Sequence, residues 1–280
     1  MAWLRSNVLF TALPALLTTA SFAGGLPRQE AVEPHMGTLV RLVFHARDAA
    51  PARAAFDRIA ALDRALSDYS PDSGLNHLCR AQSATLTGDL AAIIPQALSI
   101  ARETKGAYDP TLAALTRHMP HPPALHGYRN VTLNGLDITL TGVCFDLGGI
   151  AKGYAAREAV RALAAQGVRR AMAAVSGDIC VSGGPWRVSA QGRVVQLRDA
   201  CISTSGNEAQ PGHIFDPRTG ERVRREGQVT VIARDGARAD ALATAYFVTS
   251  PGGGWFDERQ APRPPSSAAP TRPGTPSRVR

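Results

Sequence analysis

An aspartate and a threonine lie four residues apart in the segment ADALATA, as Asp240 and Thr244. If the segment is helical, both side chains share one face, because residues four apart are neighbours on a helix. A carboxylate and a hydroxyl together offer hard oxygen ligands that suit Mg²⁺, with phosphate oxygens filling other positions. An aspartate near the start of a helix also interacts favourably with the helix dipole. On this segment alone, a magnesium site and a simple helix charge are both open.

A glycine turn with one lysine is the second candidate, in the stretch FDLGGIAKGY that ends at Tyr154. It reads as a strand end, a turn and the start of a helix, and Lys152 is one of only two lysines in the chain. Consecutive glycines expose the backbone to a ligand and the helix N-terminus adds partial positive charge, so the stretch suits a phosphate. It matches neither the GxxxxGK[ST] nor the GxGxxG pattern. A tight turn with a solvated lysine is the competing interpretation.

Two further stretches carry weaker signals. His213 stands in GHIFDPRTG, whose Asp-Pro and Thr-Gly pairs mark turns. An imidazole can act as a general base near neutral pH, although a single histidine is more often structural. The stretch CISTSGN places small hydroxyl residues before Gly206, a pattern found both in anion-contacting turns and in plain turns. Neither stretch defines a site by itself.

Helices and strands are mixed along the chain and must position these groups. Hydrophobic residues recur at helical spacing in some segments and follow strand-like patterns in others. The expected helices are residues 51–70, with Asp48 as N-cap, residues 88–106, with Pro95 near the first turns, and residues 150–167 and 237–248. The expected strands are residues 37–46, a pair around Asn134-Gly135, one strand and a turn in 169–183, and segments in 186–199 and 228–236. This mixture, with hairpins, predicts an α+β fold rather than a doubly wound sheet.

The size of the chain and its charge restrict the function classes. Its 280 residues, 44% of them hydrophobic, suffice for one large domain or two small ones. A net charge of +8 is compatible with nucleic acid, a membrane surface or a phosphate-bearing ligand. The arginines are scattered rather than clustered, so we expect no nucleic-acid partner.

The N-terminus has the layout of a secretory signal peptide. One early cation, Arg5, precedes an apolar run over residues 8–20, and the small residues Ser21 and Ala23 occupy positions that a signal peptidase prefers. The run is short and interrupted by a proline, which disfavours a membrane span. The expected cleavage point has no cysteine, so we expect no lipid anchor. A buried N-terminal helix is the alternative to a signal peptide. We expect export to the periplasm.

Three regions follow: a signal peptide over residues 1–23, one domain over 24–255 and a tail over 256–280. The tail is rich in proline and poor in large apolar residues, so we expect it to be disordered. The four cysteines form no CxxC pair, which argues against a zinc site. An oxidising compartment permits disulfides, but the sequence does not choose their pairing.

Eight stretches, in one order, resemble the ApbE family of FAD:protein FMN transferases. They are MGTLVRLVF, LSDYSPDSGLNHL, GAYDPTLAAL, FDLGGIAKGYA, AVSGDI, ISTSG, HIFDPRTG and ADALATAYFV. They span Met36 to about Pro251, and their order and spacing make the resemblance specific although no single stretch does. The resemblance implies an ApbE-like, T-fold-related domain of mixed sheet and helix.

In that family FMN passes from FAD to a Ser or Thr hydroxyl of an acceptor protein, AMP is released and Mg²⁺ is required. The resemblance implies that Asp240, Thr244 and the carbonyl of Gly149 bind the metal and that His213 takes the acceptor's proton. The residues implied at the FAD site are Met36, Tyr69, Asp109, Asp146, Lys152, Thr204, Ser205, Gly206 and Ile214. Implied acceptors are subunits of sodium-pumping quinone reductases or Rnf-type complexes, or membrane regulators of nitrous oxide reduction.

The sequence departs from the family pattern at four places, one of which is a short segment after Trp186. Ser176 stands where a glycine is usual, and Arg157 stands where an aspartate is common. After FVTSP the family usually continues into a helix and a closing strand, whereas a proline-rich tail is expected here. A flavin transferase is the leading hypothesis. An FAD-binding carrier without transfer and an FAD pyrophosphatase that releases FMN and AMP are the alternatives.

Overall fold

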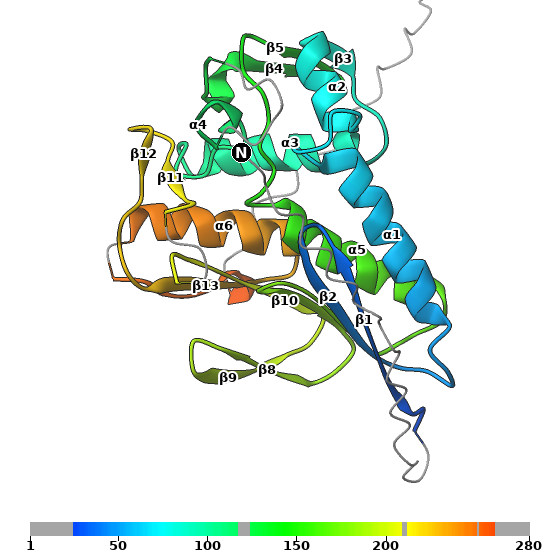
Figure 1. Cartoon of the computed structure of the whole chain (residues 1–280). Coiled ribbons are helices and arrows are strands. Elements are labelled where there is room, and N and C mark those ends of the chain that lie inside the picture. Colours follow the sequence, from blue (N-terminus) through cyan, green and yellow to red (C-terminus); the bar gives the residue numbers. More distant parts are fainter. Residues whose placement is uncertain (1–24, 117–123, 209–211, 251, 261–280) are drawn as a thin grey trace, which may run out of the picture.

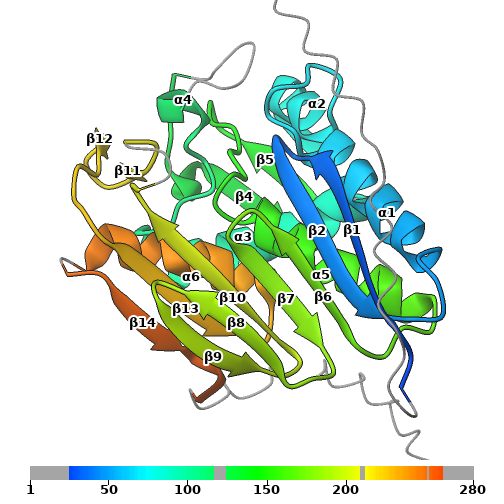
Figure 2. The same cartoon turned by 60° about the horizontal axis from the view of Figure 1, so that its bottom comes forward.

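A seven-stranded sheet lies at the centre of the fold, with the strand order β1-β2-β6-β7-β10-β13-β14 (Figure 2). The computed structural model describes residues 25–116, 124–208, 212–250 and 252–260. Neighbouring strands of this sheet are antiparallel except for β13 and β14, which are parallel. Its strands are β1 (Arg28–His35), β2 (Thr38–His45), β6 (Ala171–Val175), β7 (Asp178–Ser182), β10 (Ala200–Gly206), β13 (Gln228–Ala233) and β14 (Gly254–Asp257).

Helices cover one face of this sheet and a hairpin covers the other (Figure 1). The helices are α1 (Pro51–Leu66), α2 (Gly74–Ala81), α3 (Gly88–Glu103), α4 (Ala113–Thr116), α5 (Ala151–Ala165) and α6 (Gly236–Thr249). The hairpin on the opposite face is β8 (Trp186–Ala190) with β9 (Arg193–Leu197). Helices α5 and α6 lie directly on the sheet and against each other. The predicted α+β class is confirmed.

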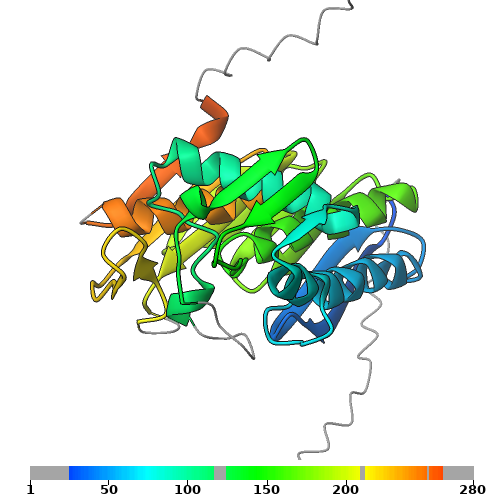
Figure 3. The same ribbon diagram turned by 90° about the horizontal axis from the view of Figure 1, so that it is seen from above.

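Two small sheets complete the fold. Strands β3 (Ser83–Thr85), β5 (Asp137–Leu140) and β4 (Val131–Asn134) form a three-stranded sheet beyond the helices (Figure 3). The predicted hairpin around Asn134-Gly135 is confirmed as the β4–β5 pair, and Gly135 has the positive φ of 62° that such a turn requires. Strands β11 (Phe215–Asp216) and β12 (Glu221–Arg222) pair next to the stretch that carries His213.

The N-terminus of α1 differs from the predicted cap. Ala50 is the N-cap residue, and Asp48 lies two positions earlier, where its carboxylate accepts a hydrogen bond from the Ala50 amide at 2.9 Å. Pro51 occupies the first helical turn, where its missing N–H costs nothing, so the helix begins at the proline. The apolar stripe of α1 faces the core as its spacing predicts, with Phe56, Ile59 and Leu62 almost fully buried.

Residues 169–183 form a hairpin rather than the one strand and turn that we predicted. β6 and β7 pair across a tight turn at Ser176 and Gly177. Ser176 has a φ of 57°, in the left-handed region that favours glycine. The turn therefore forms here with serine, in a conformation that glycine adopts more readily.

The predicted tail boundary at residue 256 is wrong for its first residues. β14 pairs with β13 from Gly254 to Asp257, and a 3₁₀ turn (η2) follows at Glu258–Gln260. The strand was missed because its glycine-rich start suggests a loop, whereas Trp255 and Phe256 both pack against the apolar clusters. A closing strand therefore follows α6 directly. Residues 261–280 lie outside the described part of the chain.

The expected signal peptide, residues 1–23, also lies outside the described residues. Within the part that the structure describes, no helix is long and apolar enough to cross a membrane.

All four cysteines are paired. Cys79 of α2 is bonded to Cys144, with the Cα atoms 5.3 Å apart, and this bond joins segments 65 residues apart in sequence. Cys180 of β7 is bonded to Cys201, which lies directly opposite on β10. Both bonds are compatible with the expected oxidising compartment.

Helices α5 and α6 touch through two glycines. A Cβ on Gly153 would clash with the carbonyl oxygen of Gly236 and would lie 2.7 Å from the Cβ of Asp240. A Cβ on Gly236 would clash with the carbonyl oxygen of Gly153 and would lie 2.7 Å from the sulfur of Cys180. Because the obstructing atoms are largely backbone, neither position has room for a side chain.

We expect the substitution Gly153→Ala to lower the free energy of unfolding by about 3 kcal/mol or more, because the added methyl group would force two helix backbones apart. Ala164→Ser adds one atom to the exposed side of the same helix and is the control. Urea unfolding of both variants measures the effect. Equal stability of the two would mean that the helices are not in backbone contact.

Candidate functional site

Oxygen atoms from three elements converge where the glycine turn meets α6. Asp240 and Thr244 lie on one face of α6, as their spacing predicts. Thr244 Oγ1 is 3.2 Å from the place that a Cβ of Gly149 would occupy and 3.2 Å from Ser205 Oγ on β10. Asp240 accepts a hydrogen bond from the Gly153 amide at 3.1 Å, in the first turn of α5. The structure therefore brings together the three implied metal ligands and one implied FAD contact.

A second buried carboxylate, Asp178 at the start of β7, faces the same region. Asp178 and Asp240 are only 5% and 4% exposed. Burial and the charge of Asp178 together raise the pKa of Asp240 to about 8, against the opposing influence of Lys152 and of the hydrogen bond from the Gly153 amide. Burial likewise raises the pKa of Asp178, against the influence of Lys152 and a hydrogen bond from Ser203. Asp178 was not predicted as a site residue.

Lys152 is the cation that faces these two acids. Its Nζ donates to the carbonyl oxygen of Gly148 at 2.9 Å. Burial would lower the pKa of Lys152, but Asp240, Asp178 and more distant carboxylates outweigh burial and raise it. One lysine thus faces two buried carboxylates, so their charges balance only when one carboxylate holds a proton or a cation takes the place of that proton.

The donor set fits Mg²⁺, which prefers carboxylate, hydroxyl and carbonyl oxygens. Among the described residues, no three His, Cys, Asp or Glu side chains gather as a metal cluster. A site here would therefore combine a single carboxylate of α6 with neutral oxygens, and would leave room for ligand oxygens.

Asp146 and Tyr69 lie on the outer side of the glycine turn. Asp146 accepts a hydrogen bond from the Gly148 amide at 2.8 Å, which shapes the turn before α5. Tyr69 follows α1 and is 65% exposed. Partial burial, Asp68 and Asp146 raise the pKa of Tyr69, so its ring lies within electrostatic range of the turn. An exposed aromatic ring at this edge is suitably placed to stack on a flavin or adenine ring.

Two of the implied FAD contacts have structural roles that are visible without a ligand. Buried Asp109 accepts hydrogen bonds from the amides of Thr111 and Tyr128, both at 2.8 Å, and from the Thr111 hydroxyl. Met36 lies in the β1–β2 turn, and its amide donates to Asp63 of α1 at 2.9 Å. Their contact with FAD stays a prediction.

The stretch with His213 is tied to β10 by Asn207. The Asn207 side chain accepts from the Gly212 amide at 3.2 Å and donates to the carbonyls of Val223 and Arg225 at 2.6 and 3.0 Å. His213 is exposed, while the neighbouring Ile214 is buried. Asn207 directly follows Gly206 and thus links the implied base to the strand that carries Thr204, Ser205 and Gly206.

Arg157, which departs from the pattern expected for the family, contacts the N-terminus of α6. Its guanidinium forms an ion pair with Asp235, the N-cap residue of α6, and stacks over the Tyr154 ring at 4.6 Å. Asp235 also accepts from Gln96 at 2.7 Å and from the Arg238 amide at 3.0 Å. The arginine therefore fixes the start of the helix that presents Asp240.

Sequence reasoning missed Asp178, Asn207 and Tyr108, whose ring lies beside Gly149. Asp178 carried a usable signal, because an acid opens the otherwise apolar strand DICVS. Asn207 resembles an ordinary turn residue, and Tyr108 resembles an ordinary core aromatic. Their positions at the site depend on segments that are distant in sequence.

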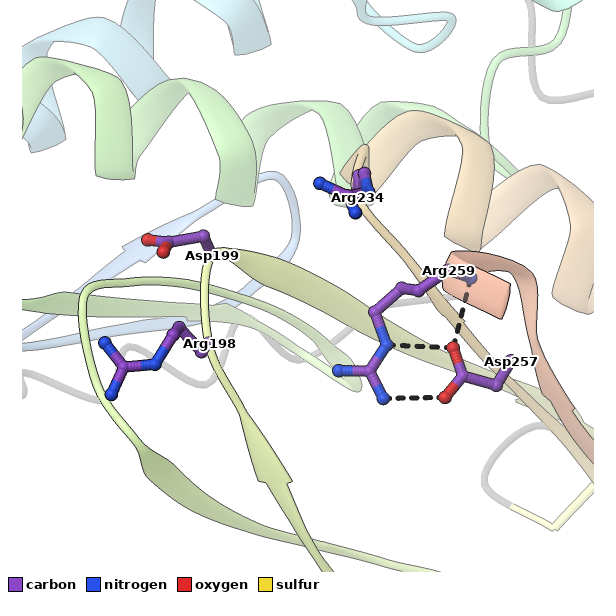
Figure 4. Close-up of a pocket in the computed structure, with 5 residues that line it drawn as sticks. All are labelled: Arg198, Asp199, Arg234, Asp257 and Arg259. Carbon is purple, nitrogen blue, oxygen red and sulfur yellow. Dashed lines mark hydrogen bonds and ion pairs between the residues drawn. The ribbon is translucent and has the colours of Figure 1, made fainter. Parts of the chain in front are cut away.

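A separate hollow of about 380 Å³ lies at the opposite end of the sheet (Figure 4). It is lined by Arg198, Asp199, Arg234, Asp257 and Arg259. Arg259 forms a bidentate ion pair with Asp257, at 2.8 and 2.6 Å. None of the predicted site residues lines this hollow.

The fold and the oxygen-rich site together define the class of protein. The sequence matches the ApbE family over residues 36–260, and the chain belongs to this family. An FAD:protein FMN transferase of Treponema pallidum is 30% identical over 276 residues, which cover 76% of both sequences. One from Rhodobacter capsulatus is 29% identical, and the match covers 76% of this chain and 50% of that relative.

Solved structures agree on the fold. The apo flavinyl transferase ApbE of Pseudomonas stutzeri has a TM-score of 0.73 at 22% identity, over 81% of this chain and 88% of that one. The ApbE protein of Thermotoga maritima has a TM-score of 0.70 at 25% identity, over 80% and 87%. The expected ApbE-like architecture is confirmed.

The raised pKa of Asp240 predicts how stability depends on pH in the absence of metal. The folded protein holds a proton at Asp240 up to about pH 8, whereas the unfolded chain releases it near the ordinary pKa of 3.8. Stability from this proton is therefore present at low pH and lost as the pH rises from about 4 to about 8. Urea unfolding in the presence of a chelator measures the slope. The substitution Asp240→Asn should remove the contribution of Asp240 to this slope. If stability falls equally steeply with pH in both proteins, the raised pKa of Asp240 is contradicted.

We expect Asn207→Ala to loosen the stretch around His213. The substitution removes three hydrogen bonds to backbone groups and leaves the Gly212 amide without the acceptor it has in the unsubstituted protein. Hydrogen exchange at Gly212 should accelerate, while the protection of β13 stays unchanged. Asn130→Ala removes a single bond to His126 in another loop and is the control. Unchanged exchange at Gly212 would show that Asn207 does not hold this stretch.

Proposed function

We propose that the chain transfers FMN from FAD to a Ser or Thr hydroxyl of an acceptor protein, with release of AMP and with Mg²⁺ bound at the α5–α6 junction. Membership of the ApbE family supports flavin transfer, and relatives in this family are named FAD:protein FMN transferases. The observation that carries the proposal is the convergence of Gly149, Thr244 and Asp240, next to Ser205 and Lys152.

Asp240, Thr244 and the carbonyl oxygen of Gly149 would hold the metal. Bound there, Mg²⁺ would neutralise charge on the diphosphate of FAD as the bond between its phosphates breaks. Lys152 supplies a second positive charge beside the same oxygens. The exposed ring of Tyr69 offers a stacking surface at the edge of the site.

The reaction proceeds by direct attack of the acceptor. The acceptor oxygen bonds to the phosphorus of the FMN half, the bond from this phosphorus to the bridging oxygen breaks, and AMP leaves with the electron pair. His213 takes the hydroxyl proton as the new bond forms. Because His213 is exposed, an acceptor segment reaches it without opening the core.

We further propose that the chain is exported and acts in the periplasm. The layout of residues 1–23 and the two disulfides support this location. Acceptors at the membrane, such as subunits of sodium-pumping quinone reductases, Rnf-type complexes or nitrous oxide reduction regulators, are compatible with it.

One experiment separates transfer from its alternatives. The purified chain is incubated with FAD, Mg²⁺ and an acceptor domain, while acceptor mass and AMP are followed, and a parallel sample contains a chelator. Covalent FMN on the acceptor with an equal amount of AMP supports transfer. AMP without modified acceptor indicates a pyrophosphatase, and neither product indicates a binding protein.

We expect His213→Ala to bind FAD as the unchanged protein does and to slow transfer about 10²- to 10⁴-fold, because general base catalysis is lost. His77→Ala, at an exposed position of α2, is the control. Calorimetry measures FAD binding and mass spectrometry measures transfer. If FAD binding collapses in His213→Ala, His213 is a structural residue.

A further inference from the structure

The hydroxyl group of Tyr108 is buried without a hydrogen bond. Tyr108 lies between α3 and α4, is 3% exposed and packs in the main hydrophobic cluster. Within the described part of the chain, no donor or acceptor pairs with its oxygen. A buried polar group without a partner costs free energy, and native proteins pair nearly all such groups. A phenylalanine would fill the same core position without that cost.

One edge of the Tyr108 ring, next to the carbon that bears the hydroxyl, faces the oxygen site. Tyr108 Cε2, a carbon next to the one that bears the hydroxyl, is 3.5 Å from the position that a Cβ of Gly149 would occupy. Thr244 Oγ1 is 3.2 Å from the same position. The edge of the tyrosine ring and the threonine hydroxyl thus both pack close to Gly149, where a side chain would crowd them.

The surroundings keep this hydroxyl protonated and therefore able to donate. Burial raises the pKa of Tyr108 well above its ordinary value, and the charges of Asp240, Asp146 and Asp109 raise it further. The hydrogen bonds of these three carboxylates go to backbone amides and to Thr111, not to Tyr108. The hydroxyl is thus a neutral donor that awaits an acceptor.

We propose that the Tyr108 hydroxyl donates a hydrogen bond to a phosphate oxygen of the FAD diphosphate bound beside Gly149 and Thr244. This inference rests on the proposed function, because that function places a diphosphate at these oxygens. The tyrosine binds the phosphate without adding charge, whereas Lys152 and the metal bind it through charge. Its burial also keeps water from competing for the same phosphate oxygen.

The substitution Tyr108→Phe tests the proposal, because it removes only the oxygen atom. Two quantities are measured for the purified full chain: the affinity for FAD and for ADP in the presence of Mg²⁺, and the stability without ligand. We expect both affinities to fall about ten-fold or more, the loss associated with one hydrogen bond to a charged group. Stability without ligand should stay unchanged or rise, since an unpaired buried oxygen has been removed.

Tyr154→Phe is the matched control. Its ring is also buried, but its hydroxyl donates to Asp89 at 3.2 Å within the protein. We expect this variant to lose stability without ligand and to keep both affinities.

The opposite pattern for Tyr108→Phe, lower stability without ligand and unchanged affinities, would overturn the proposal by indicating a partner inside the protein. The proposal would also be overturned if Tyr108→Phe changed neither the stability nor the two affinities. It would likewise be overturned if the protein without a substitution bound neither FAD nor ADP. Loss of affinity in a protein that does not modify an acceptor would support the phosphate contact and refute only the transfer reaction.

Discussion

The contact between α5 and α6 is the constraint on which the candidate site depends. Gly153 and Gly236 let the two helix backbones touch, and the Gly153 amide then reaches the carboxylate of Asp240. One turn further along α6, Thr244 lies beside Gly149, whose missing side chain allows this close approach. The oxygen site is thus a consequence of helix packing, and its geometry is set largely by residues without functional groups.

Burial of charge then determines what the site binds. Asp178 and Asp240 come from a strand and a helix that are distant in sequence, and Lys152 supplies one positive charge for both. The protein alone relieves this imbalance by holding a proton, since burial disfavours two neighbouring carboxylates in their charged forms. A divalent cation with phosphate oxygens, as in the proposed function, would relieve it as well. Proton and metal would then be alternatives at one place in the fold.

Features with strong local periodicity were predictable from sequence, and features that depend on distant segments were not. The stripe of α1, the pairing of Asp240 with Thr244 on α6 and the β4–β5 turn follow from spacing within one segment. The polar edge strand β1 and the short strand β14 lack such a period. The glycine turn was predicted as a ligand site, but the sequence did not reveal that Asp178 and Tyr108 lie near it, because β7 and the segment after α3 come together only in the tertiary structure.

The departures from the family pattern are accommodated around the site rather than within it. An arginine at position 157 reverses the charge that the family commonly has, yet its guanidinium pairs with Asp235 and so stabilises the start of α6. Ser176 adopts the left-handed conformation of the glycine that it replaces, and the turn before Asp178 is kept. β14 supplies a closing strand directly after α6. Arg157 thus supports the placement of α6 and the Ser176 turn supports that of β7, and through these two elements both residues help to position the oxygen atoms of the site.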